Sequence, residues 1–359
     1  MKRVGHLYEK ICDKETIRIA ILKASKGKRK RKDVQRVLSN IPYYVDEIHE
    51  MLTTESFTPS EYRKAEVYDG IRKKLRSISK PNFYPDQIVH WCIYLVVSPV
   101  LFKGVYAFTC GSIPGRGVHY GKRYVQRWMR KDKKNTKYYL KMDVYHFYPS
   151  IDNEVLIKKL QCKIKDPKVI AIVETIITRT DGLPIGILLS QMLANFYLFD
   201  LDNYIKQNIK ARYYIRYMDD LVILGCNKKK LHKARAMVEA HICNDGLRLK
   251  SNWQVCKTNQ ELLDFMGFRF NHNKTILRRG VMLRITRKVS RVYRKRNYSF
   301  RNACAIISYL GWIKHSDSYL LFEIWVRPKL KLQKLKQIIR EESKNGYSKI
   351  RKHRIATSA

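Results

Sequence analysis

The sequence lacks the cysteine pairs and the long apolar runs that identify several classes of protein. None of its eight cysteines forms a Cys-x-x-Cys pair, so neither a zinc site nor a disulfide framework is indicated; they stand at positions 12, 92, 110, 162, 226, 243, 256 and 304. The longest apolar run, residues 91–102, is too short to span a bilayer and contains Pro99. Residues 1–6 lack the apolar segment of a signal peptide. We therefore expect a cytoplasmic protein with reduced, buried thiols and no membrane partner.

Acidic residues are also few in this sequence relative to basic ones. The chain has 31 Asp and Glu residues against 73 Lys and Arg, which gives a formal net charge of +42 and a pI near 10.0. Because hydrophobic residues make up 45% of the 359 positions, the chain has enough apolar surface to fold. A compact protein with this charge repels itself unless its positive groups face a polyanion. Their spread along almost the whole chain indicates an extended cationic track, and nucleic acid is a better candidate partner than an anionic membrane.

Helical and strand patterns alternate irregularly along the chain. We expect helices at 8–25, 34–53, 85–97, 122–131, 153–159, 167–178, 188–208 and 228–245. We expect strands at 138–144, 247–256 and 263–279, and a hairpin at 212–225. Residues 284–359 combine helical periodicity with many Lys and Arg, which predicts a basic helical module. The regular strand–helix alternation of a doubly wound sheet is missing, which favours a mixed α/β (α+β) fold.

Two adjacent aspartates, Asp219 and Asp220, interrupt an apolar stretch at residues 215–224. The flanking Ile, Val and Tyr residues predict two short buried strands joined by a tight turn. Carboxylates at the tip of such a hairpin are costly to desolvate unless a cation is near, and oxygen ligands of this kind suit Mg²⁺. An exposed turn that merely favours Asp is the structural alternative.

A third aspartate, Asp143, lies near the end of the apolar strand predicted at 138–144, and three aromatic residues follow it within five positions. A cap or turn residue is the alternative explanation. With the first pair, this carboxylate could hold two divalent ions that activate a 3′-hydroxyl and stabilise a leaving pyrophosphate. Because adjacent strand residues face opposite sides, we expect Asp219 to be the more direct ligand and Asp220 to assist.

Four motifs in this order resemble those of the reverse transcriptases. Asp143 with Phe147 and Tyr148 resembles the first palm motif, and residues 217–220 resemble the Tyr-x-Asp-Asp box. Residues 183–191 fill the intervening nucleotide-binding motif, and residues 265–268 resemble the primer grip. The resemblance implies a right-hand polymerase, with fingers and palm made of an antiparallel sheet plus helices and with a small basic helical thumb. The implied domains are an N-terminal helical extension (1–65), fingers (66–135), palm (136–270, with fingers–palm helices 153–210) and thumb (271–359).

The resemblance also implies roles for single residues. The catalytic residues would be the three aspartates, which with Val144 would hold two Mg²⁺ ions, or Mn²⁺ in their place. Tyr148 matches the steric gate against a ribose 2′-OH, and Arg76 matches the fingers arginine that contacts the triphosphate. Core packing for Tyr148, bare turn geometry for Gly186 and a surface amide for Gln191 are the structural alternatives. The implied sets are the dNTP-binding residues Arg76, Phe147, Tyr148, Ile185, Gly186 and Gln191, the active-site hairpin residues Tyr217 and Met218, and the primer-grip residues Phe265, Met266 and Gly267.

The middle motif departs from most of the superfamily. It has Ile185-Gly186 and Ser190-Gln191 where Gln-Gly and Ser-Pro are usual, and this variant resembles the reverse transcriptases of diversity-generating retroelements. That resemblance implies an enzyme of a bacterial or phage-infected cell that copies template RNA into cDNA during mutagenic retrohoming, with errors opposite template adenine. It also implies a small basic accessory protein oligomer as partner. The high net positive charge further predicts a structured non-coding RNA as a partner. Replacing the Gln amide by Ile185 predicts looser positioning of the nucleotide.

Two positions depart from the family pattern, and other functions stay open. Asp86-Gln87 stands where the fingers often have Asp-Arg, and Trp253 stands where a lysine often protonates the leaving group, with Lys250 and Lys257 as possible substitutes. A phage-defence (antiviral) reverse transcriptase is the main alternative. Retron and group II intron enzymes are less favoured, because we find neither a strong retron thumb motif nor a maturase-like extension. A non-catalytic RNA-binding scaffold is a further alternative, against which the three intact aspartates argue.

Overall fold

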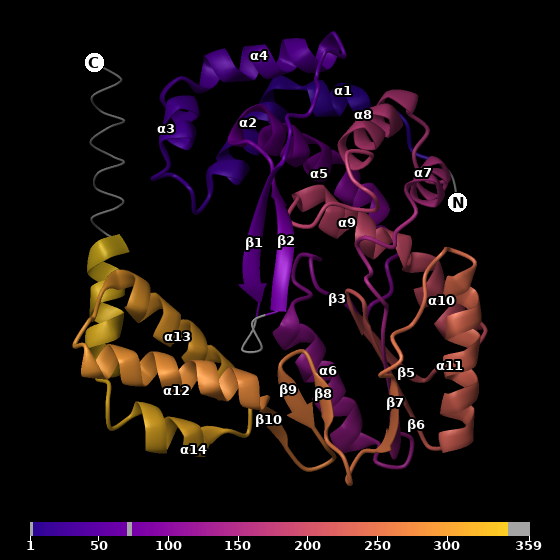
Figure 1. The fold of residues 1–359 in the computed structure, drawn as a ribbon, viewed down its shortest axis with the longest axis vertical. Coiled ribbons are helices and arrows are strands. Elements are labelled where there is room, and N and C mark those ends of the chain that lie inside the picture. The colour runs from indigo at the N-terminus through magenta and orange to yellow at the C-terminus, as the bar shows by residue number, and fades with distance from the viewer. Residues whose placement is uncertain (1–2, 70–73, 344–359) are drawn as a thin grey trace. The chain divides into compact units, whose positions relative to one another are not determined.

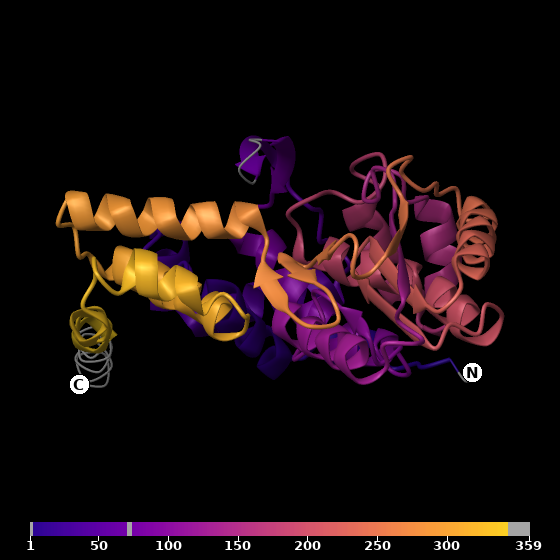
Figure 2. The ribbon, with the colours of Figure 1, turned by 90° about the horizontal axis from the view of Figure 1, so that it is seen from below.

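The computed structural model describes residues 3–69 and 74–343, which fold into helices and mainly antiparallel sheets (Figures 1 and 2). The mixed α/β class predicted from the sequence is confirmed. The chain divides into two compact units, each described by itself below. Among the described residues, the first consists of 3–69, 74–121 and 134–256, and the second of 122–133 and 257–343.

Four helices begin the first unit: α1 (Tyr8–Cys12), α2 (Lys14–Ser25), α3 (Lys32–Ser39) and α4 (Ile41–Thr53). The single helices predicted at 8–25 and 34–53 are therefore wrong, because each is divided by a capping residue. Asp13 has extended backbone angles and its side chain accepts a hydrogen bond from Thr16 N at 2.8 Å, which starts α2. Asn40 caps α4 in the same way, through Tyr43 N. A helix-capping side chain inside an apolar pattern leaves the periodicity almost unchanged while it breaks the backbone.

A two-stranded antiparallel hairpin follows, formed by β1 (Arg63–Asp69) and β2 (Lys74–Lys80). After a short π-helical segment, η1 (Phe83–Gln87), the chain enters α5 (Ile88–Leu101), one turn later than the helix predicted at 85–97. Most of its side chains are buried, and α5 packs against α2 and α9. This helix thus connects the N-terminal helices with the helices near the sheet.

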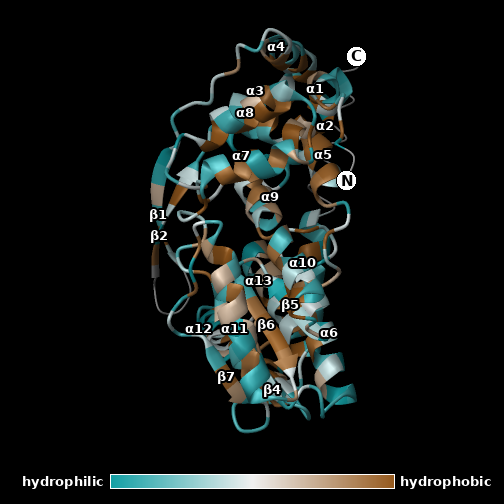
Figure 3. Cartoon of the chain, turned by 90° about the vertical axis from the view of Figure 1, so that its right-hand side faces the viewer, coloured by the Kyte–Doolittle hydropathy of each residue, from teal (hydrophilic) through white to brown (hydrophobic). Residues whose placement is uncertain are grey.

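The central sheet of the first unit has five strands, and it carries the predicted hairpin. Their order is β3 (Thr109–Cys110), β5 (Tyr213–Tyr217), β6 (Asp220–Gly225), β4 (Tyr138–Asp143) and β7 (Gln254–Lys257). β3 runs parallel to β5, whereas β5, β6 and β4 pair in antiparallel fashion. The four central residues of β6, 221–224, are buried and hydrophobic (Figure 3).

Five further helices of the first unit follow β4 along the chain. They are α7 (Asn153–Gln161), α8 (Pro167–Ile177), α9 (Leu188–Tyr197), α10 (Phe199–Gln207) and α11 (Lys228–Cys243). α11 packs against β4 and β6. The long helix predicted at 188–208 is wrong, because the backbone leaves helical geometry at Leu198 and divides it into α9 and α10.

The second unit contains most of α6 (Val118–Lys131), which begins earlier than the helix predicted at 122–131. It also contains a small antiparallel sheet of β8 (Leu263–Phe265), β9 (Phe268–Phe270) and β10 (Thr275–Leu277). The helices that follow are α12 (Arg279–Arg294), α13 (Phe300–Lys314), α14 (Tyr319–Leu321) and η2 (Phe322–Val326). α12 and α13 lie side by side (Figures 1 and 2). The predicted basic helical module thus begins at Arg279, and residues 344–359 of that prediction lie outside the described residues.

All eight cysteines are free, but only Cys12, Cys92 and Cys110 are buried. The prediction of uniformly buried thiols is therefore wrong for the other five. Within residues 3–69 and 74–343, no helix is both long and apolar enough to cross a bilayer.

Candidate active site

The turn between β5 and β6 consists of Met218 and Asp219, with Tyr217 and Asp220 paired on either side. Met218 has a φ of +54°, a left-handed conformation that residues other than glycine rarely adopt. Its amide donates to Cys110 O at 3.1 Å, which fixes the turn to the end of β3. The two short buried strands and tight turn predicted from the sequence are confirmed.

The pairing of strands brings the three aspartates together. Asp143, the last residue of β4, lies opposite Asp220, the first residue of β6. Val144 N donates to Asp219 O at 3.2 Å, so the chain after β4 is bonded to the hairpin tip. Asp219 lies in the turn and Asp220 begins β6, and the expectation that Asp219 is the more direct ligand stays a prediction.

Electrostatics distinguish this cluster from surface acids. Burial and the neighbouring Asp143 carboxylate raise the pKa of Asp220 to about 7. The same two causes raise the pKa of Asp219. The site therefore holds more negative charge than its surroundings balance, which is the situation that bound cations relieve.

One lysine supplies part of the missing positive charge. Lys250 Nζ forms an ion pair with Asp143 Oδ1, and Lys250 N donates to Asp143 O at 2.8 Å. No group of three or more His, Cys, Asp or Glu side chains in the described part of the chain is arranged as a formed metal site. The three carboxylates nevertheless fit a divalent cation, since all are hard oxygen donors and the pKa values of Asp219 and Asp220 are raised by burial and by Asp143.

The segment after Asp143 packs against the turn that precedes α9. Tyr148 O accepts a hydrogen bond from Leu183 N at 2.9 Å. Gly182 has a φ of +67°, and a Cβ atom there would lie 2.5 Å from Tyr148 O, so only glycine allows this contact. Burial and, next, Asp219 raise the pKa of the Tyr148 hydroxyl. Phe147, with its ring 5.7 Å from that of Tyr148, is buried.

The residues Ile185 and Gly186 contact the β1–β2 hairpin. Ser79 N, in β2, donates to Ile185 O at 2.7 Å. Gly186 has a φ of +108°, and a Cβ atom there would lie 2.6 Å from Ser79 O. Arg76 lies three residues earlier on the same strand, with an exposed side chain. These contacts bring the middle motif and the strand of Arg76 together.

A basic cavity of about 880 Å³ opens beside this contact. Gly186 and Gln191 belong to its wall, and Gln191 Oε1 also accepts a hydrogen bond from Ser112 Oγ at 3.2 Å. One acid, Asp33, is among the described residues that line the cavity. Its cationic lining residues are Lys23, Lys26, Lys28, Arg31, Arg63 and Lys80. Such an excess of cations in one hollow suits the phosphates of a polyanion.

The residues that depart from the family pattern, Asp86-Gln87 and Trp253, each make local contacts in the structure. The Asp86 side chain is buried and accepts hydrogen bonds from Ser60 and from Asn82 N, so it caps a turn. Gln87 Oε1 accepts a hydrogen bond from Lys28 Nζ, which connects the Lys- and Arg-rich residues 26–32 to the start of α5.

Trp253, the second departure, packs under Arg235, with 4.8 Å from the guanidinium carbon to the ring centre. Its indole therefore contributes to packing, whereas Lys250, three residues earlier, reaches the carboxylates. Of the two proposed substitutes, the structure brings Lys250 to Asp143.

The predicted primer grip forms the turn between β8 and β9 in the second unit. Met266 and Gly267 have φ values of +51° and +84°, and Phe265 is buried. A Cβ atom on Gly267 would lie 2.9 Å from the ring of Trp312. The turn is thus tightly packed within its own unit, and its role toward a primer stays a prediction.

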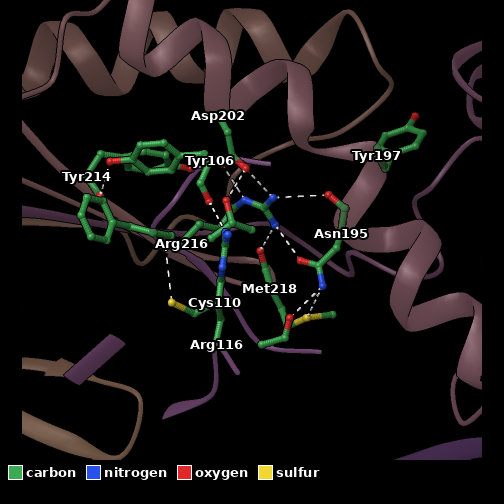
Figure 4. A network of polar contacts seen from close by, with 12 residues as sticks. Tyr106, Cys110, Arg116, Asn195, Tyr197, Asp202, Tyr214, Arg216 and Met218 are labelled. Atoms are coloured by element: carbon green, nitrogen blue, oxygen red, sulfur yellow. Dashed lines mark hydrogen bonds and ion pairs between the residues drawn. The ribbon is translucent and has the colours of Figure 1, made fainter. Parts of the chain in front are cut away.

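Sequence reasoning missed a buried polar network behind the hairpin (Figure 4). Arg216 and Asp202 are almost fully buried and form a bidentate ion pair, with N–O distances of 2.8 and 2.6 Å. Asn195 contacts the same guanidinium. Removing one partner of such a pair typically costs about 3–5 kcal/mol, because the other charge stays buried. The available signal was an arginine inside the apolar stretch 213–224, although nothing there identified its partner.

Comparison with known proteins gives consistent results. A family model described as Reverse transcriptase (RNA-dependent DNA polymerase) matches residues 63–270, more than half of the chain. The Retron Ec73 reverse transcriptase of Escherichia coli is 28% identical over 193 residues, which cover 48% of this chain. The Group II intron-encoded protein LtrA of Lactococcus lactis subsp. cremoris is 22% identical over 174 residues, which cover 45%.

The matches are partial on the side of the relatives as well. The aligned region covers 58% of the retron protein and 28% of LtrA. Among solved structures, apo telomerase from Candida tropicalis, truncated from its C-terminal domain, aligns with a TM-score of 0.46 at 12% identity. That alignment covers 64% of this chain and 58% of the telomerase chain.

Proposed function

Because the chain belongs to the reverse transcriptase (RNA-dependent DNA polymerase) family, we propose that it copies an RNA template into DNA. The observation that carries this proposal is the pairing of β4 with the β5–β6 hairpin, which gathers Asp143, Asp219 and Asp220. Two Mg²⁺ ions, or Mn²⁺, held by these carboxylates and the main chain of Val144, would neutralise the triphosphate and activate the primer hydroxyl.

The other site residues would bind and orient the substrates. The Tyr148 side chain would bound the nucleotide sugar, and Gly186, where Ser79 O lies close to the position of a Cβ atom, would line the pocket beside the base pair. Arg76 would contact the triphosphate. The Phe265–Met266–Gly267 turn would hold the primer strand. Ile185 and Gln191 would complete the dNTP pocket, next to the basic cavity that suits the phosphates of the template.

We propose domains to match these roles. Residues 1–65 form an N-terminal extension, 66–135 the fingers, 136–270 the palm and 271–359 the thumb. The hairpin of β1 and β2 supports the fingers assignment, since β2 is bonded to the nucleotide motif. The basic helix α12 supports the thumb assignment, because it offers cations to a nucleic acid backbone.

Primer extension tests the polymerase proposal. The full chain, given Mg²⁺, dNTPs and a DNA primer on an RNA template, should add nucleotides, and Asp219→Asn should abolish the addition. Asp200→Asn is the matched control, because Asp200 is an exposed carboxylate paired with Lys159. Wild-type protein that binds the primer–template without extending it would favour the non-catalytic scaffold.

We further propose that the enzyme belongs to the diversity-generating type and is error-prone opposite template adenine. The Ile185-Gly186 and Ser190-Gln191 variant supports this assignment. Its partners would be a structured non-coding RNA and a small basic accessory protein oligomer, in the cytoplasm of a bacterial or phage-infected cell. The matched relatives come from the retron and group II intron groups, and a phage-defence enzyme is the other candidate.

Fidelity tests the subtype proposal separately from the activity. Ile185 O is bonded to Ser79 N, so an Ile185→Gln substitution changes the side chain while the main-chain contact stays. We expect the restored amide to lower misincorporation opposite template adenine by about 10-fold, measured by sequencing the cDNA. An unchanged error spectrum would contradict the assignment of low fidelity to Ile185.

A further inference from the structure

The ion pair behind the active-site hairpin extends to the hairpin itself. Arg216 Nη1 donates to Met218 O at 2.9 Å, while the rest of the guanidinium is held by Asp202 (Figure 4). Met218 O belongs to the peptide group that joins Met218 to Asp219. The guanidinium therefore contacts the main chain directly before the residue that carries the carboxylate. The left-handed φ of Met218 needs such support, because an L-residue seldom adopts it.

Asn195 contacts the same tip from α9. Its Oδ1 accepts from Arg216 Nη1 at 3.2 Å, and its Nδ2 donates to Gly111 O at 2.9 Å and lies 3.2 Å from Met218 Sδ. Asn195 stands one helical turn after Gln191, whose carbonyl it also contacts. One buried amide thus links the hairpin tip to the helix that carries part of the predicted nucleotide motif.

The loop after β3 closes the remaining side of Met218. Gly111 has a φ of +85°, and a Cβ atom there would lie 3.0 Å from Met218 Cγ. Three groups of Met218 are therefore held by different parts of the fold. Its amide is held by Cys110, its sulfur by Asn195 and its carbonyl by Arg216.

We propose that Arg216 and Asn195 are positioning residues that set the location of Asp219 through Met218. This inference rests on the proposed polymerase function for its kinetic consequence. Asp202 anchors Arg216 and acts only through it. A merely structural role is the competing explanation, since any buried ion pair contributes to stability.

The network offers matched controls for that alternative. Tyr214 Oη and Thr109 Oγ1 donate to the Asp202 carboxylate, both at 2.7 Å, and neither forms a hydrogen bond with Met218. Tyr214→Phe and Thr109→Val therefore weaken the same buried cluster without removing a contact to the tip. Asn195→Asp and Arg216→Lys keep size or charge while they remove donors to the tip region.

Steady-state kinetics on an RNA template separate the two roles. For Asn195→Asp and Arg216→Lys we expect kcat to fall about 100-fold, with the KM for dNTP changed less than about 3-fold. Tyr214→Phe and Thr109→Val should lower Tm yet keep kcat within about 3-fold of wild type. A fall in kcat that follows the loss of Tm across all four variants would overturn the proposal.

A spectroscopic measurement on the protein without substrate makes the test independent of activity. The chain has nine methionines, so methyl-labelled methionine gives a small set of signals, and Met218→Leu identifies that of Met218. Its methyl resonance should shift in Asn195→Asp and Arg216→Lys, and stay in place in the two controls. An unmoved Met218 signal in both positioning variants would overturn the inference even if wild-type polymerase activity is found. Wild-type protein that shows no polymerase activity would contradict only the proposed function.

Discussion

At the scale of single residues, Tyr148 is the side chain that would separate deoxyribonucleotides from ribonucleotides. Its main chain is fixed by Leu183, and its hydroxyl lies within the electrostatic influence of Asp219. In the proposed role, a rigid ring beside the carboxylates would leave little space for an additional hydroxyl on the sugar. The size of the Tyr148 ring, and not its hydroxyl, should then decide the selection of deoxyribonucleotides over ribonucleotides.

We predict that Tyr148→Ala increases ribonucleotide incorporation relative to deoxyribonucleotide incorporation by about 10-fold or more. Tyr148→Phe keeps the ring and should leave the ratio near that of wild type. Competing rNTP and dNTP additions on one RNA template measure the ratio directly. Equal ratios for the Ala and Phe variants would show that the ring is not the selective group.

Charged residues within apolar stretches of the sequence identified part of the site, but they did not reveal the buried ion pair behind it. Asp219 and Asp220 stood out because an apolar hairpin has no reason to carry two carboxylates. Arg216 lies in the same stretch, yet its partner Asp202 is fourteen positions earlier on another element. Sequence patterns report the cost of a buried charge, whereas only the fold shows what balances it.

At the scale of elements, the β8–β9 turn shows how a glycine fixes a small sheet to its helices. Gly267 combines a positive φ with a contact that leaves no space for Cβ, against Trp312 of α13. Trp312 in turn stacks on Phe268, with ring centres 5.1 Å apart. The turn, the sheet and α13 therefore share one packed cluster within the second unit.

We predict that Gly267→Ala lowers the free energy of unfolding by about 1–3 kcal/mol, through strain and overpacking. Gly311→Ala, in the same unit, should have the opposite sign. Gly311 lies inside α13 with open space at its Cβ position, and alanine favours a helix by roughly 0.5–1 kcal/mol. Thermal unfolding of both variants checks the contrast, and equal destabilisation would contradict it.

Strand pairing was easier to foresee than helix boundaries. The hairpin at 212–225 was predictable because two apolar runs rich in Ile, Val and Tyr flank a two-residue turn, across which Tyr217 pairs with Asp220. The helices at 8–25, 34–53 and 188–208 were not, because Asp13, Asn40 and Leu198 interrupt the backbone without disturbing the apolar periodicity. Local capping and tertiary packing decide such breaks.

At the scale of the whole molecule, the net charge of +42 should dominate nucleic acid binding. Part of this charge is gathered in the basic cavity, where one acid faces six cations. Affinity for single-stranded RNA should therefore fall steeply with salt, with a log–log slope of about −0.7 for each phosphate neutralised.

We predict that Lys26→Gln with Lys80→Gln, both in the cavity, makes this slope shallower by about 1.4, or two phosphates. Lys228→Gln with Lys229→Gln removes two charges at the start of α11 and serves as the control. Binding titrations between roughly 50 and 200 mM salt give both slopes. Equal changes for the two pairs would mean that RNA responds to total charge and not to the cavity.

The family could be predicted from the order of motifs along the chain, because the catalytic chemistry needs all of them. The proposed subtype rests on a few positions such as Ile185, whose effect on fidelity would be a small free-energy difference in the nucleotide pocket. Function at the level of the family and function at the level of the subtype therefore need separate experiments.

The rate of the first nucleotide addition tests the central claim most directly. Single-turnover extension of a DNA primer on an RNA template, with Mg²⁺, compares wild-type protein with Asp143→Asn, which changes the carboxylate opposite Asp220. The account predicts extension by wild type and a loss on the order of 10³-fold in the variant. Extension at the same rate by both proteins, or by neither, would contradict it.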